Sequence, residues 1–271
     1  IGERISLICP DVQPPDDCEV IDAKGKFVFP GFIDPHVHIY LPFMGTFSKD
    51  TYVTGSPAAL VGGTTTLIEM CCPSRKDDAL ESFELWMSQA VGKSACDFSF
   101  HMGVTKFDDK SEQQLREIVK RGISSFKIFL AYKGAFGVDD TELYRTLKLA
   151  KELGVIVTAH CENETLVAER SKELLAAGKT DPGQHHESRP PAVEAFAELT
   201  GAATYIVHLS CKEARDQAIA ARQRGVRVTV ETLIQYLTLD KTYAEKPKCE
   251  GAKYVMSPPL RDKYNQDVLW N

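Results

Sequence analysis

The sequence predicts a parallel (β/α)8 barrel of the TIM type, preceded by a small segment of β-structure. Its length of 271 residues accommodates such a barrel, which needs about 250. From Pro30 onward, a short apolar run, a loop and an amphipathic stretch follow one another repeatedly, which is typical of βα units around a parallel sheet. Several of these apolar runs end in histidine. Because all strands of a parallel barrel end at one face, those histidines are expected to meet there.

Residues 1–29 are expected to form part of a small β-sandwich domain. Short strand candidates lie at 4–8, 18–22 and 27–29, and Pro14-Pro15 and Gly25 separate them. No helical periodicity is present in this segment. It therefore differs in kind from the rest of the chain.

Residues 30–271 are expected to form the barrel. Strand candidates lie at 31–38, 65–69, 97–102, 125–130, 155–160, 205–209 and 227–231, with helical patterns such as 112–120 and 141–153 between them. Gly154 follows the second of these helices in the manner of a C-cap. Seven βα units are visible, and the sequence begins within a strand pattern and stops as a helical one begins. We therefore expect a TIM-like barrel that is truncated before strand 8 and incomplete at the C-terminus.

Composition excludes several classes of function. The formal net charge is −6, and Lys and Arg are interspersed with Asp and Glu, which argues against nucleic acid as a partner. No apolar stretch reaches the roughly 18 residues of a membrane span, and no signal-peptide pattern opens the sequence. The eight cysteines are scattered without a C-x-x-C pair, which favours reduced thiols in a cytoplasmic protein. A small neutral substrate fits this composition best.

His36 and His38 end the first strand candidate and could bind one metal ion together. Residues two apart on a strand point to the same side, as two ligands of one ion require. A His-x-His pair alone is more often a packing accident. His160 and His208 also follow apolar strands, and each taken singly reads as a buried structural histidine. The four together favour a metal site, because they occupy the ends of strands that meet at one face.

Lys127 lies within an otherwise apolar strand candidate. A buried, unpaired ammonium is costly, so this amine must be paired, neutral or modified. The structural interpretation is a salt bridge. The functional one is a lysine carboxylated by CO2, which becomes an anion able to bridge two metal ions.

Six motifs, in order along nearly the whole chain, now carry a family resemblance. They are GFIDPHVH at 31–38, SFK at 125–127, AHCEN at 159–163, VHLS at 207–210, ET with QYL within 231–237, and SPPLR at 257–261. This set resembles the hydantoinase/dihydropyrimidinase branch of the amidohydrolase superfamily. The resemblance implies a metal-dependent hydrolase that opens cyclic amide rings, dihydropyrimidines or hydantoins, to N-carbamoyl amino acids.

The resemblance also implies roles for individual residues. His36 and His38 would bind the first of two divalent ions and His160 and His208 the second, with N6-carboxylated Lys127 as the bridge and zinc as the preferred metal. Tyr132 matches the tyrosine that hydrogen-bonds the developing oxyanion, and Ser257 the serine whose backbone contacts the substrate. The family's strand-8 aspartate is expected beyond the end of this sequence, so neither Asp262 nor Asp267 is assigned to it. A homotetramer or dimer is expected.

Two alternative functions remain open. Dihydroorotase and allantoinase share similar metal motifs, although a dihydroorotase would need further cations to hold its substrate's carboxylate. The collapsin response mediator proteins resemble this branch but are non-catalytic scaffolds that have lost metal ligands, whereas all five candidate ligands stand here. His185 and His186 are interpreted as structural, His101 as a packing or supporting residue, and Glu162 as a group that could orient His160.

Overall fold

The computed structural model describes residues 4–43, 45–191 and 203–271, and the chain divides into two units, Ile1–Gly31 and Phe32–Asn271. The described part of the first unit, residues 4–31, contains no helix or strand, so the three short strands expected there are not formed. Their apolar side chains are exposed; Phe27, for example, is 90% exposed. An extended segment becomes a strand only when a neighbour pairs with its backbone, and no such pairing occurs in these residues. Assignment of 1–29 to a separate β-domain stays a prediction.

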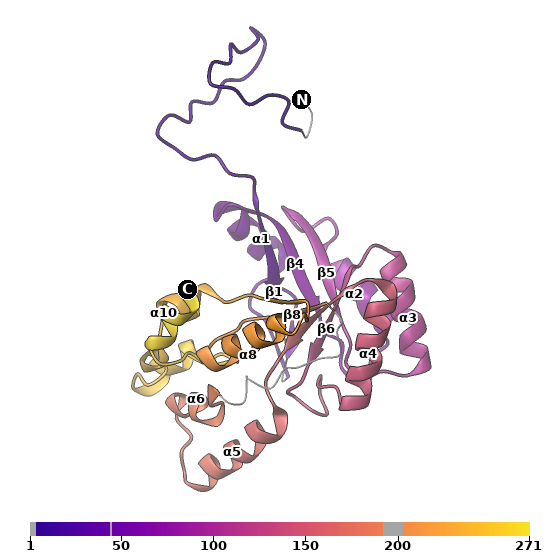
Figure 1. Cartoon of the computed structure of the whole chain (residues 1–271), viewed down its shortest axis with the longest axis vertical. Helices are drawn as coiled ribbons and strands as arrows, with labels where there is room; N and C mark the ends of the chain where they lie inside the picture. The colour runs from indigo at the N-terminus through magenta and orange to yellow at the C-terminus, as the bar shows by residue number, and fades with distance from the viewer. Residues whose placement is uncertain (1–3, 44, 192–202) are drawn as a thin grey trace. The chain divides into compact units, whose positions relative to one another are not determined.

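The second unit contains a seven-stranded sheet whose strand order follows the chain (Figure 1). The strands, all parallel, are β1 (Phe32–Val37), β4 (Thr64–Cys71), β5 (Asp97–Gly103), β6 (Ser125–Phe129), β7 (Ile156–His160), β8 (Thr204–Ile206) and β9 (Val228–Val230). Each of the seven strands predicted for residues 30–271 is present, and the curled parallel sheet confirms the βα-barrel architecture. A separate antiparallel pair, β2 (Pro42–Phe43) and β3 (Thr46–Phe47), lies in the loop after β1.

Helices connect successive strands. The longer ones are α1 (Tyr52–Val61), α2 (Ala79–Ala90), α3 (Asp109–Lys120), α4 (Asp140–Leu153), α5 (Glu164–Ala176) and α8 (Lys212–Gln223). Shorter elements are η1 (Pro182–Gln184), α6 (His185–Ser188), α9 (Ile234–Thr238), η2 (Lys241–Tyr243), η3 (Lys248–Tyr254) and α10 (Tyr264–Trp270). None of the helices in the described ranges is long and apolar enough to cross a membrane.

Capping residues explain where two predicted helices begin and end. The α3 helix starts three residues before the predicted 112, because the Asp108 side chain accepts the backbone N–H of Ser111 and caps the first turn. The α4 helix is capped in the same way by Asp139. It ends at Gly154, whose φ of 71° is the left-handed conformation expected of a C-cap glycine.

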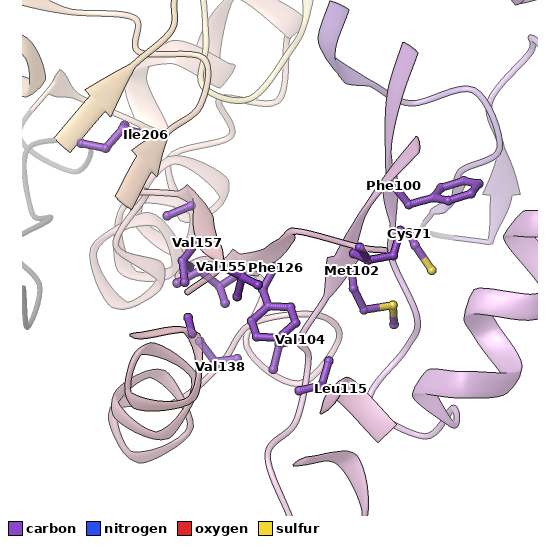
Figure 2. Close-up of a cluster of buried hydrophobic side chains, with 14 of the residues drawn as sticks. Cys71, Phe100, Met102, Val104, Leu115, Phe126, Val138, Val155, Val157 and Ile206 are labelled. Carbon is purple, nitrogen blue, oxygen red and sulfur yellow. The ribbon is translucent and has the colours of Figure 1, made fainter. Parts of the chain in front are cut away.

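The main core packs one face of the sheet against the surrounding helices. Figure 2 shows Phe126 of β6 near Val104, Leu115 of α3 and Val138, with Val157 of the next strand alongside. Every residue of β6 is buried. Because side chains alternate along a strand, Phe126 and Ile128 point to this core while Lys127 between them points to the opposite side. That alternation places a buried amine inside the curve of the sheet.

The curvature of the sheet brings its first and last strands together. In the strand order, β1 and β9 are the two edges. Even so, the Glu231 carboxylate, directly after β9, contacts the Nδ1 atom of His36 in β1. The barrel-like curl is therefore tight enough for one side chain to bridge the two edges.

Candidate metal centre

A cavity of about 840 Å³ lies at the carboxyl ends of the strands. Its lining includes all the residues singled out for the site, which come from six separate segments of the chain: His36, His38, Lys127, Tyr132, His160, His208 and Ser257. Parallel strands explain the convergence, since each strand delivers its last residues to the same end of the sheet.

The four histidines form one cluster. The ring centroids of His36 and His38 are 5.3 Å apart, those of His36 and His208 are 5.4 Å apart, and those of His160 and His208 are 4.6 Å apart. Burial lowers the pKa of His36, and it lowers the pKa values of His38 and His208 well below the ordinary range. These rings are therefore neutral at pH 7 and keep a lone pair with which to bind a metal ion.

Lys127 lies among these rings as an amine without a partner. Its side chain is 1% exposed, and its Nζ atom has no hydrogen bond. The Nζ atom lies over the ring of Phe129, 4.8 Å from its centroid. Burial lowers the pKa of Lys127 to about 8, so a substantial fraction of the amine is neutral near physiological pH.

Two carboxylates contact ring nitrogens of the histidine cluster. Glu162 is fully buried, and its Oε2 atom lies 2.7 Å from Nε2 of His160, as expected for an orienting group. On the other side, Glu231 contacts His36 and also accepts a hydrogen bond of 2.9 Å from the Tyr205 hydroxyl. Burial alone would raise the pKa of Glu231, but its hydrogen bonds outweigh this effect and lower the pKa. Both groups are anionic at neutral pH.

Glu231 was not recognised as a site residue from the sequence. It belongs to a quoted motif, but no chemistry was attached to it. One signal in the sequence could have identified it. Glu231 comes directly after a mostly apolar run, just as His160 and His208 do. The rule that polar residues at strand ends converge applies to carboxylates as well as to imidazoles.

Tyr132 is held in the cavity by an unusual turn. Its φ of 62° lies in the left-handed region, which costs a tyrosine free energy. Its carbonyl accepts hydrogen bonds of 2.9–3.1 Å from the N–H groups of Ala135, Phe136 and Gly137, and its own N–H donates to Glu164 at 2.6 Å. These four bonds fix the turn. Burial raises the pKa of Tyr132, so its hydroxyl keeps the proton that an oxyanion donor must offer.

Ser257 and His185 form another part of the cavity wall. His185 was interpreted as structural, yet it lines the cavity; its Nε2 atom lies 2.9 Å from the carbonyl oxygen of Met256 and 3.1 Å from Oγ of Ser257. It holds in place the loop that carries the predicted substrate contact. Arg189 also lines the cavity, with its Nε atom 3.5 Å from Glu162.

His101 takes no part in the cluster. Its Nδ1 atom lies 2.6 Å from Oγ of Ser125, and its Nε2 atom lies 2.8 Å from the carbonyl oxygen of Pro35. With both ring nitrogens engaged, it braces β1 next to the His-x-His pair, in keeping with its expected supporting role. Within residues 4–43, 45–191 and 203–271, no three His, Cys, Asp or Glu side chains are arranged as a ready metal site.

Comparisons with known proteins agree with the geometry. The model of the amidohydrolase family matches residues 27–256. The D-hydantoinase of Geobacillus stearothermophilus is 46% identical over 262 residues, which are 93% of this chain and 56% of that protein. The dihydropyrimidinase of Rattus norvegicus is 39% identical over 265 residues, 93% of this chain and 51% of that protein.

A solved structure shows the same similarity in three dimensions. The D-hydantoinase (dihydropyrimidinase) from Thermus sp. superimposes with a TM-score of 0.91 at 65% sequence identity, covering 95% of this chain and 58% of that one. The chain thus spans little more than half the length of the relatives that it matches.

Proposed function

The chain belongs to the amidohydrolase family, in its hydantoinase/dihydropyrimidinase branch, and on this basis we propose that it hydrolyses cyclic amides. The substrates would be dihydropyrimidine or hydantoin rings, and the products N-carbamoyl amino acids. The observation that carries the proposal is the meeting of four histidines and a buried, unpartnered lysine in one cavity.

The residues of the cavity fit a pair of divalent ions, and zinc is our first choice because imidazole and carboxylate-type ligands suit it. His36 and His38 would hold one ion, His160 and His208 the other, and carboxylated Lys127 would lie between them. The orphaned Nζ of Lys127 supports this assignment, since a carbamate would give that buried atom a function and a charge to balance the ions. When bound, such ions activate water and polarise the carbonyl that it attacks.

The chain's own side chains would then complete the chemistry. The Tyr132 hydroxyl, which stays protonated, donates a hydrogen bond to the carbonyl oxygen as negative charge develops there. The backbone of Ser257 contacts the amide edge of the ring. Leu41, Phe43 and Phe136 form an apolar part of the cavity lining, which limits access of bulk water to the ring.

Replacing Lys127 tests the proposal directly. In Lys127→Ala, hydrolysis of dihydrouracil should be abolished and zinc content should fall, because the group between the ions is gone. Short carboxylic acids should restore part of the activity. The matched control is Lys120→Ala, which removes an exposed lysine of α3. Full zinc content and normal turnover in Lys127→Ala would disprove the carbamate, and a wild-type protein that binds no metal would favour the non-catalytic scaffold.

The structure bears on the dihydroorotase alternative through Arg189. That reaction needs a cation for the carboxylate of its substrate, and Arg189 lines the cavity. However, the charge of Arg189 already faces Glu162. We therefore favour a neutral ring. Comparing turnover of dihydrouracil, phenylhydantoin, dihydroorotate and allantoin decides between these substrates.

The proposed setting is a cytoplasmic homo-oligomer, a tetramer or dimer. All eight cysteines are free thiols, and four of them are buried, which supports a reducing compartment. The oligomeric state rests on the resemblance to the family, and sedimentation of the purified protein measures it.

A further inference from the structure

We propose that Glu231 is a positioning residue that holds ligands of both metal ions at once. The inference rests on the proposed function, because it takes His36 and His208 as ligands of different ions. What it adds is a single carboxylate on which both sites depend.

The side-chain contacts of Glu231 reach two other strands, β1 and β8. Its Oε1 atom contacts Nδ1 of His36 in β1 and accepts the backbone N–H of His208, after β8, at 3.1 Å. Its Oε2 atom accepts the Tyr205 hydroxyl of β8 at 2.9 Å. The side chains of His36 and Glu231 are only 7% and 11% exposed, so water competes little for these bonds. The carboxylate is therefore held by both of its oxygens.

The contact with His36 determines which of its nitrogens can bind a metal. An anionic carboxylate favours a proton on the nitrogen that it touches, here Nδ1. Nε2 is then left unprotonated and free for an ion. Metal-binding histidines are commonly oriented by a carboxylate on the second ring nitrogen, and losing that partner typically costs about 10–100-fold in metal affinity or activity.

The contact with His208 acts through the backbone. His208 has a φ of 44°, a left-handed conformation that a histidine adopts only when its surroundings enforce it. The bond from its N–H to Glu231 is one such restraint, and two backbone bonds beside it are others: Leu209 N–H to the Glu231 carbonyl at 2.8 Å, and Glu231 N–H to the Ile206 carbonyl at 3.0 Å. Glu231 would thereby help to hold His208 where its ring could bind the other ion.

The test measures zinc binding in the full chain by competition with a chromophoric chelator, together with the Tm of each metal-free protein. Glu231→Gln, which keeps the shape but not the charge, should lower zinc affinity at both sites by about tenfold, and Glu231→Ala by up to about 100-fold. Tyr205→Phe, which frees one oxygen of Glu231 without touching a proposed ligand, should give a smaller loss. Glu152→Gln removes an exposed carboxylate of α4 and serves as the control.

The outcomes distinguish a residue that positions the histidine ligands from one that only connects strands β1 and β9. If Glu231→Gln lowers Tm but binds two zinc ions with wild-type affinity, Glu231 only ties β9 to β1 and the inference is wrong. A loss confined to one ion contradicts the shared role. If the wild-type protein itself takes up no zinc, the proposed function fails and this inference with it, whereas normal zinc uptake by wild type and variants alike overturns the inference alone.

Discussion

Lys127 shows how the surroundings of one residue can set its chemistry. On the protein surface its amine would be charged at neutral pH. Here the amine has neither solvent nor a hydrogen-bond partner, and burial lowers its pKa to about 8. The neutral form of an amine is the one that attacks CO2, so the same burial that destabilises the cation favours the proposed carboxylation.

Uptake of CO2 by metal-free protein should consequently depend on pH in a specific way. At constant dissolved CO2, the rate should rise as pH rises through about 8 and then level off, because the amine is by then neutral. An exposed lysine, with a pKa of about 10.4, would continue to gain rate well above pH 9. Incorporation of ¹³C-labelled CO2, followed by NMR, measures this curve. A profile like that of an ordinary lysine would show that burial does not activate Lys127.

Tyr132→Phe should lower kcat while leaving the zinc content unchanged. In its proposed role the phenol contributes chiefly when charge develops on the carbonyl oxygen, and losing one such donor typically costs about 10²–10³ in rate. Steady-state kinetics and metal analysis of the same preparation provide the measurement. If zinc is lost and the turnover per bound metal is unchanged, Tyr132 supports the metal site instead.

At the scale of the element, the turn from Tyr132 to Gly137 depends on Gly137, a residue that does not line the cavity. A Cβ atom at Gly137 would lie 2.3 Å from the carbonyl oxygen of Ala131 and 2.8 Å from the backbone nitrogen of Lys133. Both are backbone atoms, so the turn itself would have to shift. The Arg75 side chain, which does not belong to the turn, donates a hydrogen bond of 2.9 Å to the carbonyl of Gly137 and further restrains the turn.

Gly137→Ala should therefore reduce kcat and destabilise the protein by about 1–3 kcal/mol, the usual cost of forcing extra volume into a packed site. The control is Gly55→Ala in α1, where the added Cβ would make only ordinary contacts at 3.5 Å and helix propensity favours alanine. Chemical denaturation and kinetics of both variants test the difference. Equal behaviour of the two would mean that the turn adapts freely.

Much of this element structure was predictable, and what was missed has a physical cause. Strands such as β6 and β7 are runs of mostly apolar residues, and a run of consecutive residues can be recognised directly in the sequence. The bond from Tyr132 to Glu164 and the contacts of His185 with the loop at 256–257 join segments that are distant in the sequence, and no local pattern encodes them. The segments at 4–8, 18–22 and 27–29 have strand-like composition, but composition does not supply the neighbour that a strand must pair with.

At the scale of the whole molecule, removal of metal should lower stability. A ligand that binds only the folded protein stabilises it by about 2.7 kcal/mol at a concentration of 100 times its Kd, which corresponds to a rise in Tm of roughly 5 °C or more. Calorimetry before and after chelation measures the shift. The shift should persist in Lys120→Ala and largely vanish in Lys127→Ala. If the Tm of the wild-type protein is the same before and after chelation, the protein does not bind metal tightly.

The bridge between β1 and β9 also has a consequence for the time course of folding. His36 and Glu231 are separated by 195 positions, and closing a loop of that length costs roughly 4–5 kcal/mol in chain entropy. Most of this cost is avoided only if the intervening strands have already paired, one after another. A chain emerging from the ribosome has His36 and His38 early but acquires the bridging carboxylate almost 200 residues later. In refolding experiments, zinc uptake should therefore lag behind the far-ultraviolet circular dichroism signal; simultaneous phases would place metal capture earlier. In this order of events, the metal binds after the strands of the sheet have paired, so metal binding does not guide the assembly of the sheet.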